Sequence, residues 1–227
     1  MIERHMFRAR LKKGMEERAV AVMYQEHAGQ TFIDTGHCMT VAGFIFERDA
    51  FLYIEQLTGQ VAPELIVPGL NAMLEDWPGQ EEARKWIALI DVFHFNEPAS
   101  LDHWNRKEKP ERIGGRVAYL RPEMVASYIF YHYQLQEERG FTGPKYEMIG
   151  MHENLLFGYQ EFPAVVEEPI LPGRLTSKHT PVPWATTRMD LHFKEWEDGH
   201  QFFKRFDAVF HCYVAREKGS QITFING

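Results

Sequence analysis

The sequence has few cysteines, no long apolar run and none of the common nucleotide-binding motifs. Its two cysteines, Cys38 and Cys212, predict a reduced, cytoplasmic protein, although folding could still bring the two thiols together. No run approaches the roughly 20 apolar residues that a membrane-spanning helix needs, and the first residues lack the apolar stretch of a signal peptide. Because G-x-x-x-x-G-K-[ST], G-x-G-x-x-G and G-x-S-x-G are all absent, we expect neither nucleotide binding nor serine acyl chemistry.

Positive charge is also scarce. The net charge of -7 argues against a nucleic-acid partner, since such domains usually carry a basic face. The chain has 11 histidines but no His-x-His, His-x-x-x-His or Cys-x-x-Cys pair, so we expect no metal and no other cofactor. What is plentiful is apolar and aromatic side chains, at 44% and 14% of the residues. This composition is typical of a globular protein with a sizeable core, and it suits a pocket for a flat, apolar ligand.

Two short patterns are repeated in the same order. The tripeptide Val-Phe-His occurs at 92–94 and again at 209–211, and Met15, Tyr24 and Gln25 recur as the same residues at 124, 133 and 134. Such echoes indicate an internal duplication. Segment 96–115 holds two prolines, a charge cluster and Gly-Gly, which is typical of a linker. We therefore predict two modules, 1–95 and 116–227.

Each half has the pattern strand, helix, two strands, helical region, strand, which is the order of a ferredoxin-like module. We predict an α+β fold in which two ferredoxin-like β-α-β-β-α-β modules form a dimeric α+β barrel-type pseudo-dimer. The closed barrel would hold one small ligand between its two sheets. The predicted elements are a strand at 7–12, helices at 15–27 and from 124, hairpins at 38–57 and 146–162, helical regions at 63–85 and 194–206, and a proline-rich insert at 163–183.

Candidate catalytic residues lie on the predicted strands. Phe51, Tyr53 and Glu55 share one strand face, because side chains alternate along a strand. If that face is buried, the pKa of Glu55 would be raised and the carboxyl group could act as a base; a solvent-facing position is about equally compatible. His94 and His211 share a face with valines, so each is either a packed core residue or an inward-facing catalytic group.

Other candidates lie at the ends of elements. His27 ends the first predicted helix, where it would reach a pocket rim or simply be favoured by the helix dipole. His37 opens the second strand and Trp184 closely follows the proline-rich insert, so both are candidates for substrate binding, as is Tyr53. His132 falls on the apolar face of the second helix, and we expect it to be a packed core histidine.

Three segments of the first half carry a resemblance to a known family. They are Tyr-Gln-Glu-His at 24–27, Phe-Leu-Tyr-Ile-Glu at 51–55 and Val-Phe-His-Phe at 92–95. They resemble tetracenomycin-type aromatic polyketide cyclases, and the double module resembles SchA/CurD-like proteins of the dimeric α+β barrel superfamily. The resemblance implies a His-Asp pair after the first helix, where this chain has His27 and Ala28. It also implies a histidine in the third strand, at the position of Glu55.

The resemblance implies a cofactor-independent cyclase or aromatase acting on a poly-β-ketone or polycyclic aromatic intermediate, by aldol cyclisation and dehydration. One alternative is a cofactor-free monooxygenase that oxidises an anthrone to a quinone, and another is a non-catalytic polyketide-binding or assembly partner. Polyketide synthase components are candidate partners, and the chain would be a monomeric pseudo-dimer or a homodimer. The expected catalytic residues are His27, Glu55, His94 and His211, and the expected substrate-binding residues are Tyr53, His37 and Trp184.

Overall fold

The computed structural model describes residues 1–26, 29–59, 61–79, 83–216 and 222–226. The chain divides into two compact units, and neither is a continuous stretch of sequence. The two units do not coincide with the expected modules at 1–95 and 116–227, which stay predictions, and residues of the expected linker at 96–115 belong to both units. Unit 1 consists of Met1–Leu89, Ser100–Lys109 and Asp207–Gly227, and unit 2 consists of Ile90–Ala99 and Pro110–Phe206.

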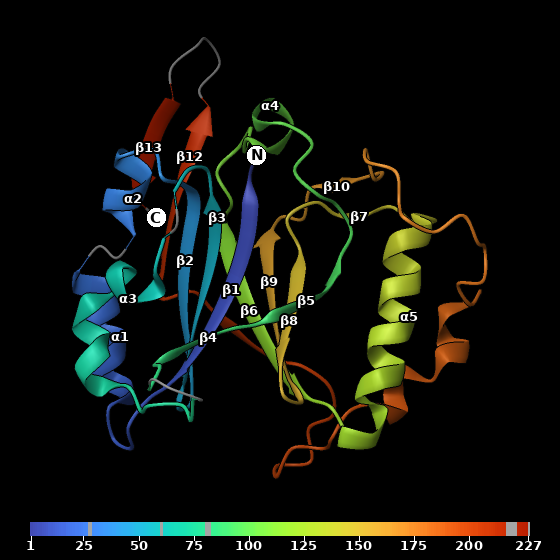
Figure 1. Cartoon of the computed structure of the whole chain (residues 1–227), viewed down its shortest axis with the longest axis horizontal. Coiled ribbons are helices and arrows are strands. Elements are labelled where there is room, and N and C mark those ends of the chain that lie inside the picture. The colour runs from blue at the N-terminus through green and yellow to red at the C-terminus, as the bar shows by residue number, and fades with distance from the viewer. Residues whose placement is uncertain (27–28, 60, 80–82, 217–221, 227) are drawn as a thin grey trace. The chain divides into compact units, whose positions relative to one another are not determined.

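Unit 1 contains a six-stranded sheet in the order β13-β12-β2-β3-β1-β4 (Figure 1). The first four strands of the chain follow the order fourth-first-third-second, as in a ferredoxin-like module. Every residue of β3 is buried, so both faces of the sheet are covered at this strand. The strands are β1 (Glu3–Arg10), β2 (Cys38–Phe46), β3 (Asp49–Gln56), β4 (Trp86–Ala88), β12 (Phe210–Arg216) and β13 (Ile222–Asn226).

The helices of unit 1 are short, and most of them lie on one side of the sheet (Figure 1). Helix α1 (Glu16–Gln25) buries Ala19 and Met23, as the apolar spacing predicted. Two glutamates in its first turn interact favourably with the positive end of the helix dipole. The other helices are α2 (Gln30–Asp34), α3 (Pro63–Ile66), the 3-10 helix η1 (Pro68–Met73) and α4 (Leu101–Trp104).

Unit 2 contains a five-stranded sheet in the order β11-β6-β9-β8-β5, with the long helix α5 on one face (Figure 1). The core between this helix and the sheet includes Phe93, Ala118, Tyr128 and Ile149. The elements are β5 (Ile90–His94), β6 (Arg112–Tyr119), η2 (Pro122–Met124), α5 (Val125–Glu138), β7 (Gly143–Pro144), β8 (Met148–His152), β9 (Leu155–Phe162), β10 (Val166–Glu167), η3 (Trp184–Thr187), η4 (Met189–Leu191) and β11 (Lys204–Asp207).

Each Val-Phe-His segment lies at a strand that joins the sheet built mainly from the other half of the chain. Strand β5, which ends at His94, pairs with β8 of unit 2, although it directly follows the strands of unit 1. Strand β12 begins at Phe210 and pairs with β2 of unit 1, and then with β13. The second copy therefore opens a strand, whereas the first copy closes one. Each sheet has the same four-strand order, to which unit 1 adds β12 and β13 and unit 2 adds β5. The duplication and the closed barrel stay predictions.

The predicted hairpins are confirmed. Strands β2 and β3 are joined by Glu47-Arg48, and β8 and β9 by Glu153-Asn154. The first residue of each loop has a positive φ, 51° for Glu47 and 57° for Glu153. A positive φ at this position matches the right-handed twist of the flanking strands, so the two loops turn the chain in the same way.

The predicted helical regions are largely wrong. Among the described residues of 63–85, only α3 and η1 are helical, because Pro68 interrupts the helix. Segment 194–206 contains no helix, and its last residues belong to strand β11. The insert at 163–183 is mostly irregular, as its prolines predicted, apart from the two-residue strand β10.

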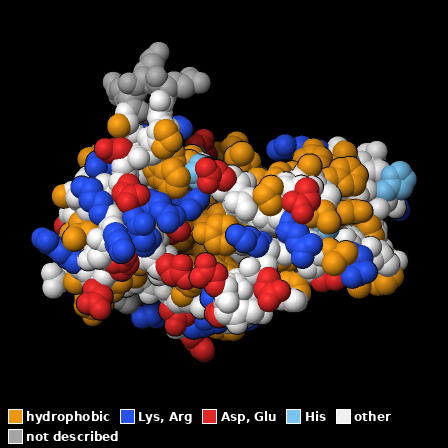
Figure 2. Space-filling model, turned by 90° about the horizontal axis from the view of Figure 1, so that it is seen from below, with side chains coloured by type: hydrophobic (Ala, Val, Ile, Leu, Met, Phe, Trp, Pro, Cys, Tyr) orange, Lys and Arg blue, Asp and Glu red, His pale blue; other side chains and the backbone are white. Residues whose placement is uncertain are grey.

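Both cysteines are buried in unit 1. On the face of the molecule drawn in Figure 2, basic and acidic side chains lie close to one another. Within the described part of the chain, no helix is long and apolar enough to cross a membrane. The same residues contain no group of three His, Cys, Asp or Glu side chains that could hold a metal ion.

Candidate active site

Glu55 is the centre of a buried polar cluster in unit 1. Its Oε1 atom accepts hydrogen bonds from Tyr53 Oη, Trp104 Nε1 and Arg106 Nη2, each at 2.8 Å. Its Oε2 atom accepts a second bond from Arg106 Nη1. Neither Glu55 nor Trp104 has any solvent exposure, and Arg106 is 1% exposed. The carboxylate is thus held by two side chains of the segment predicted to be a linker.

This environment corrects the expectation of a raised pKa for Glu55. Burial alone raises the pKa of the carboxyl group, but the charge of Arg106 and the hydrogen bonds from Arg106, Trp104 and Tyr53 outweigh it and lower the pKa below its ordinary value. Glu55 is therefore an ionised carboxylate with its acceptor positions occupied. It is suited to hold structure, and a role as general base would require its partners to move first.

His211 lies on the same sheet face as Glu55 and Tyr53. Its register partner on β2 is Ala42, which pairs with Tyr53 on the other side. The ring stacks on Tyr213 with centroids 4.8 Å apart, and Nε2 has no hydrogen-bond partner among the described residues. Burial, followed by the charge of Arg106, lowers the pKa of His211 to about 3. At neutral pH His211 is consequently an uncharged imidazole.

Replacing His211 with phenylalanine should reduce the acid sensitivity of unit 1. Because the pKa of His211 is near 6.5 in the unfolded chain and about 3 in the fold, the unfolded state takes up the proton first as the pH falls. The stability that wild type owes to the neutral His211 should therefore be fully present above pH 6.5 and decline below it. The histidine-specific loss should reach about 3 kcal/mol at pH 4.

The measurement is urea unfolding at steps between pH 7.5 and pH 4. His179→Phe is the control, because His179 is exposed. His211→Phe should lose less stability than wild type over this range, whereas His179→Phe should follow wild type. Parallel curves for all three proteins would contradict a buried neutral His211.

Unit 2 contains the same tyrosine–glutamate arrangement. Tyr159 Oη donates a hydrogen bond of 2.6 Å to Glu161 Oε1 on β9, as Tyr53 does to Glu55 on β3. Both glutamates are buried. The sequence carries this signal as Phe-x-Tyr-x-Glu at 51–55 and 157–161. A search for spaced repeats, and not only for contiguous ones, would have found it.

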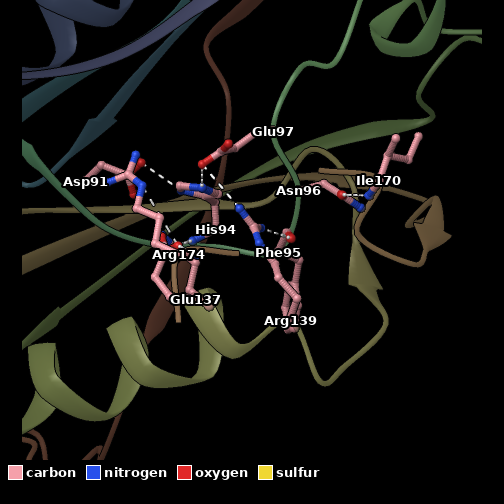
Figure 3. Close-up of polar contacts among 10 residues, drawn as sticks. Asp91, His94, Phe95, Asn96, Glu97, Glu137, Arg139, Ile170 and Arg174 are labelled. Carbon is pink, nitrogen blue, oxygen red and sulfur yellow. Dashed lines mark hydrogen bonds and ion pairs between the residues drawn. The ribbon is translucent and has the colours of Figure 1, made fainter. Parts of the chain in front are cut away.

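His94 belongs to a polar network at the end of β5 (Figure 3). Its Nδ1 lies 2.7 Å from Asp91 Oδ2 and its Nε2 lies 2.9 Å from Glu97 Oε1. The Glu97 carboxylate also pairs with Arg139 at 3.3 Å. Both ring nitrogens of His94 therefore contact carboxylate oxygens of neighbouring residues. This geometry favours a structural role, and the predicted catalytic role stays a prediction.

The other predicted residues lie in different surroundings. His37 is exposed, with Nδ1 2.8 Å from Thr35 Oγ1. His27 lies outside the described residues. Trp184, at the start of η3, lines a cavity within unit 2.

This cavity measures about 460 Å³, a size that suits a small organic ligand. It is enclosed mainly by aromatic and aliphatic side chains, with a few polar groups among them. The expected pocket between two sheets stays a prediction, because every residue around this cavity belongs to unit 2. The lining residues include Phe93, Phe95, Tyr128, Leu135, Ile149, Trp184, Phe193 and Phe203, and the polar residues Arg116, His132, Thr142, Glu147 and Arg205.

His132 contributes a neutral imidazole to the cavity wall. Its Nδ1 lies 2.8 Å from the Tyr128 carbonyl oxygen, which can only accept, so Nδ1 carries the proton. Burial is the main cause that lowers the pKa of His132 to about 4. Its Nε2, with a lone pair, makes no hydrogen bond to any described residue. This places a proton acceptor at the cavity, and it corrects the expectation that His132 is only a core residue.

Aromatic rings and an ion pair surround this imidazole. His132 stacks on Tyr128 with centroids 3.9 Å apart, and the Trp184 ring meets it edge-on at 5.5 Å. Arg116 pairs with Glu147, and its guanidinium carbon lies 5.0 Å above the Phe203 ring. The wall is thus mostly apolar, and its polar groups are the His132 imidazole, the Arg116–Glu147 ion pair, Thr142 and Arg205.

Comparisons with known proteins do not assign a family. No protein-family model matches the chain, and no curated protein matches it. One similar solved structure is a "putative monooxygenase" from Lactobacillus acidophilus NCFM, with 7% identity, a TM-score of 0.40, and coverage of 91% of this chain and 92% of that chain. Another is a "putative monooxygenase" from Fusobacterium nucleatum subsp. nucleatum, with 12% identity, a TM-score of 0.37, and coverage of 91% and 90%. Likeness at this level carries no weight for the function of this chain.

Proposed function

We propose that this chain is a cofactor-independent enzyme that removes a proton from a flat, carbonyl-bearing substrate in the unit 2 cavity and closes a ring by aldol chemistry. The substrate class is a poly-β-ketone or a polycyclic aromatic intermediate. The observation that carries the proposal is the free Nε2 lone pair of His132 at an aromatic-lined cavity. A positioned base in a largely apolar site is the main requirement of this chemistry.

In the first step, His132 Nε2 takes a proton from the carbon between two carbonyl groups. The electron pair of the broken C–H bond moves into the enolate. The enolate carbon then forms a C–C bond to a second carbonyl carbon, whose oxygen becomes an alkoxide. The alkoxide recovers the proton from His132, and loss of water then gives the aromatic ring. Because the pKa of His132 is about 4, its protonated form is a stronger acid than an ordinary imidazolium group and returns the proton readily.

Two further groups support this sequence of steps. Trp184 and Phe93 present apolar surface against which a flat ring can pack. The Arg116 guanidinium is held in place by Glu147 and by Gln160 Oε1 at 3.3 Å. A positive group fixed before the reaction stabilises a developing enolate without reorganisation, although the neighbouring carboxylate of Glu147 reduces its effect.

The proposal is tested with 2-tetralone, a flat ketone whose acidic C–H protons exchange with D2O. The protein should accelerate exchange at least about tenfold over free imidazole at the same concentration, measured by NMR. Thr142→Trp, which places a large ring at the cavity, should abolish the acceleration while leaving the circular dichroism unchanged. Binding without exchange would support a non-catalytic polyketide-binding protein instead.

Oxygen uptake separates aldol cyclisation from oxidation. Anthrone and one O2 give anthraquinone and one water when a monooxygenase acts, so an oxygen electrode records one O2 per turnover. An aldol enzyme consumes none. Stoichiometric uptake with anthrone would replace the cyclase proposal by the monooxygenase, since both reactions begin with the same loss of a proton.

A further inference from the structure

The wall of the unit 2 cavity carries an excess of positive charge. Arg116 and Arg205 line the cavity, and Arg112 joins them around a smaller neighbouring hollow beside Gly114 and Gly115. Glu147 is the one carboxylate in the lining of these two hollows, as far as the described residues extend. In a chain with a net charge of -7, this local balance is unusual. It favours a ligand that brings its own negative charge.

The arginines are brought together by strand geometry. Alternate residues of β6 share one face of the sheet, and they include Arg112, Gly114 and Arg116. Ala118 continues that face into the core that includes Tyr128 of α5. Strand β11 lies beside β6 in the sheet and contributes Arg205. The positive charges therefore lie on the face of the sheet toward α5.

Only Arg205 is left without a partner among these arginines. Arg116 is bound to Glu147 and Gln160, and Arg112 packs against the Phe162 ring at 4.1 Å. The Arg205 side chain makes no hydrogen bond or ion pair with any described residue, and it is exposed at the cavity. A guanidinium group in this state offers two parallel N–H donors, which match the two oxygens of a carboxylate.

We infer that the unit 2 cavity selects flat aromatic molecules that carry a carboxylate, and that Arg205 determines this selectivity. The aromatic part packs against Trp184, Phe93 and Phe203, while the carboxylate faces Arg205. This inference rests on the proposed function, because it uses the same cavity and adds the charge of the substrate. It assigns Arg205 to binding and leaves proton transfer to His132.

The test compares 2-naphthoate with 2-naphthamide, which have nearly the same shape and differ in charge. Isothermal titration calorimetry at pH 7.5 and low salt should show about fivefold tighter binding of the naphthoate to wild type. Arg205→Gln should reduce this ratio to about one and leave the naphthamide affinity unchanged, whereas Arg205→Lys should keep part of the preference. High salt should weaken the preference in wild type.

Arg174→Gln is the matched control, because Arg174 is a largely exposed arginine of unit 2 that does not line the cavity. It should retain the full preference for naphthoate. Equal affinities of wild type for the two probes would overturn the inference, as would a preference that survives in Arg205→Gln. Absence of binding of either probe would overturn both the inference and the aromatic cavity of the proposed function. Selective binding of naphthoate without exchange of 2-tetralone would overturn the proposed catalysis alone.

Discussion

Replacing His132 with glutamine should slow the exchange of 2-tetralone by at least about 10²-fold, because general bases typically contribute 10²- to 10⁴-fold to the rate. Glutamine keeps an N–H donor for the Tyr128 carbonyl group but has no basic nitrogen. The fold should therefore persist while proton removal fails. The measurement is the initial rate of deuterium incorporation with saturating substrate, for wild type and variant at the same pH.

The pH profile gives an independent readout of the same residue. Since the pKa of His132 is about 4, the imidazole is a competent base throughout the range from pH 5 to 8. The acidic limb of the wild-type rate should then lie near pH 4, and not near the ordinary histidine value of 6.5. His179→Gln, a change at an exposed histidine outside the cavity lining, should leave both the rate and the profile unchanged.

Added imidazole supplies a further check. Imidazole should restore part of the exchange in a His132→Gly variant, in which the cavity is enlarged, and not in Thr142→Trp. A His132→Gln variant with more than a third of the wild-type rate would rule out His132 as the base.

Replacing Arg106 with methionine should lower the free energy of unfolding by about 3–5 kcal/mol. The loss is this large because the Glu55 carboxyl group would lose its counter-ion in a fully buried position, where it either stays charged and unpaired or must take up a proton. Methionine has a similar length and is apolar, so lost packing adds little. Urea unfolding followed by tryptophan fluorescence measures the change at pH 7.5, where Glu55 is ionised in the wild-type protein.

The double variant Glu55→Gln with Arg106→Met separates the lost charge pair from other effects. It should be more stable than Arg106→Met alone, since a neutral amide is much less costly to bury than an unpaired carboxylate. Arg174→Met should change stability by less than about 0.5 kcal/mol, because the Arg174 side chain is 74% exposed. A loss below about 1 kcal/mol in Arg106→Met would show that the buried pair contributes little.

Local patterns predicted the elements whose sequence alone specifies them. Helix α1 and the β2–β3 and β8–β9 hairpins follow from apolar spacing and turn residues within about 20 positions of each other. The helical region at 194–206 was mispredicted, because the end of this segment forms strand β11. The region at 63–85 forms only the short helices α3 and η1 within the described residues. Tertiary packing overrides weak helix propensity in such segments.

The candidate residues show the same limit. Tyr53 and Glu55 were correctly predicted to share a strand face, because that depends only on the two-residue period of a strand. The partners that hold Glu55, Trp104 and Arg106, lie about 50 positions away in a segment with the composition of a linker. Nothing in the local sequence indicates that these two side chains turn inward. The pKa of Glu55 is consequently lowered, opposite to the expectation from burial alone.

The sequence by itself determined the first helix, the two hairpins, the shared strand face of Tyr53 and Glu55, and the aromatic character of the interior. It also contained the repeated Val-Phe-His, and with it the two strands β5 and β12. Only the tertiary structure decided which sheet each of these strands joins, and it assigns both to the unit built mainly from the other half of the chain. The physical reason is that strands pair through backbone hydrogen bonds, which are the same for every residue except proline. The cavity with His132 and Arg205 likewise exists only because α5, the sheet and the segment from Trp184 to Arg205 pack together in unit 2.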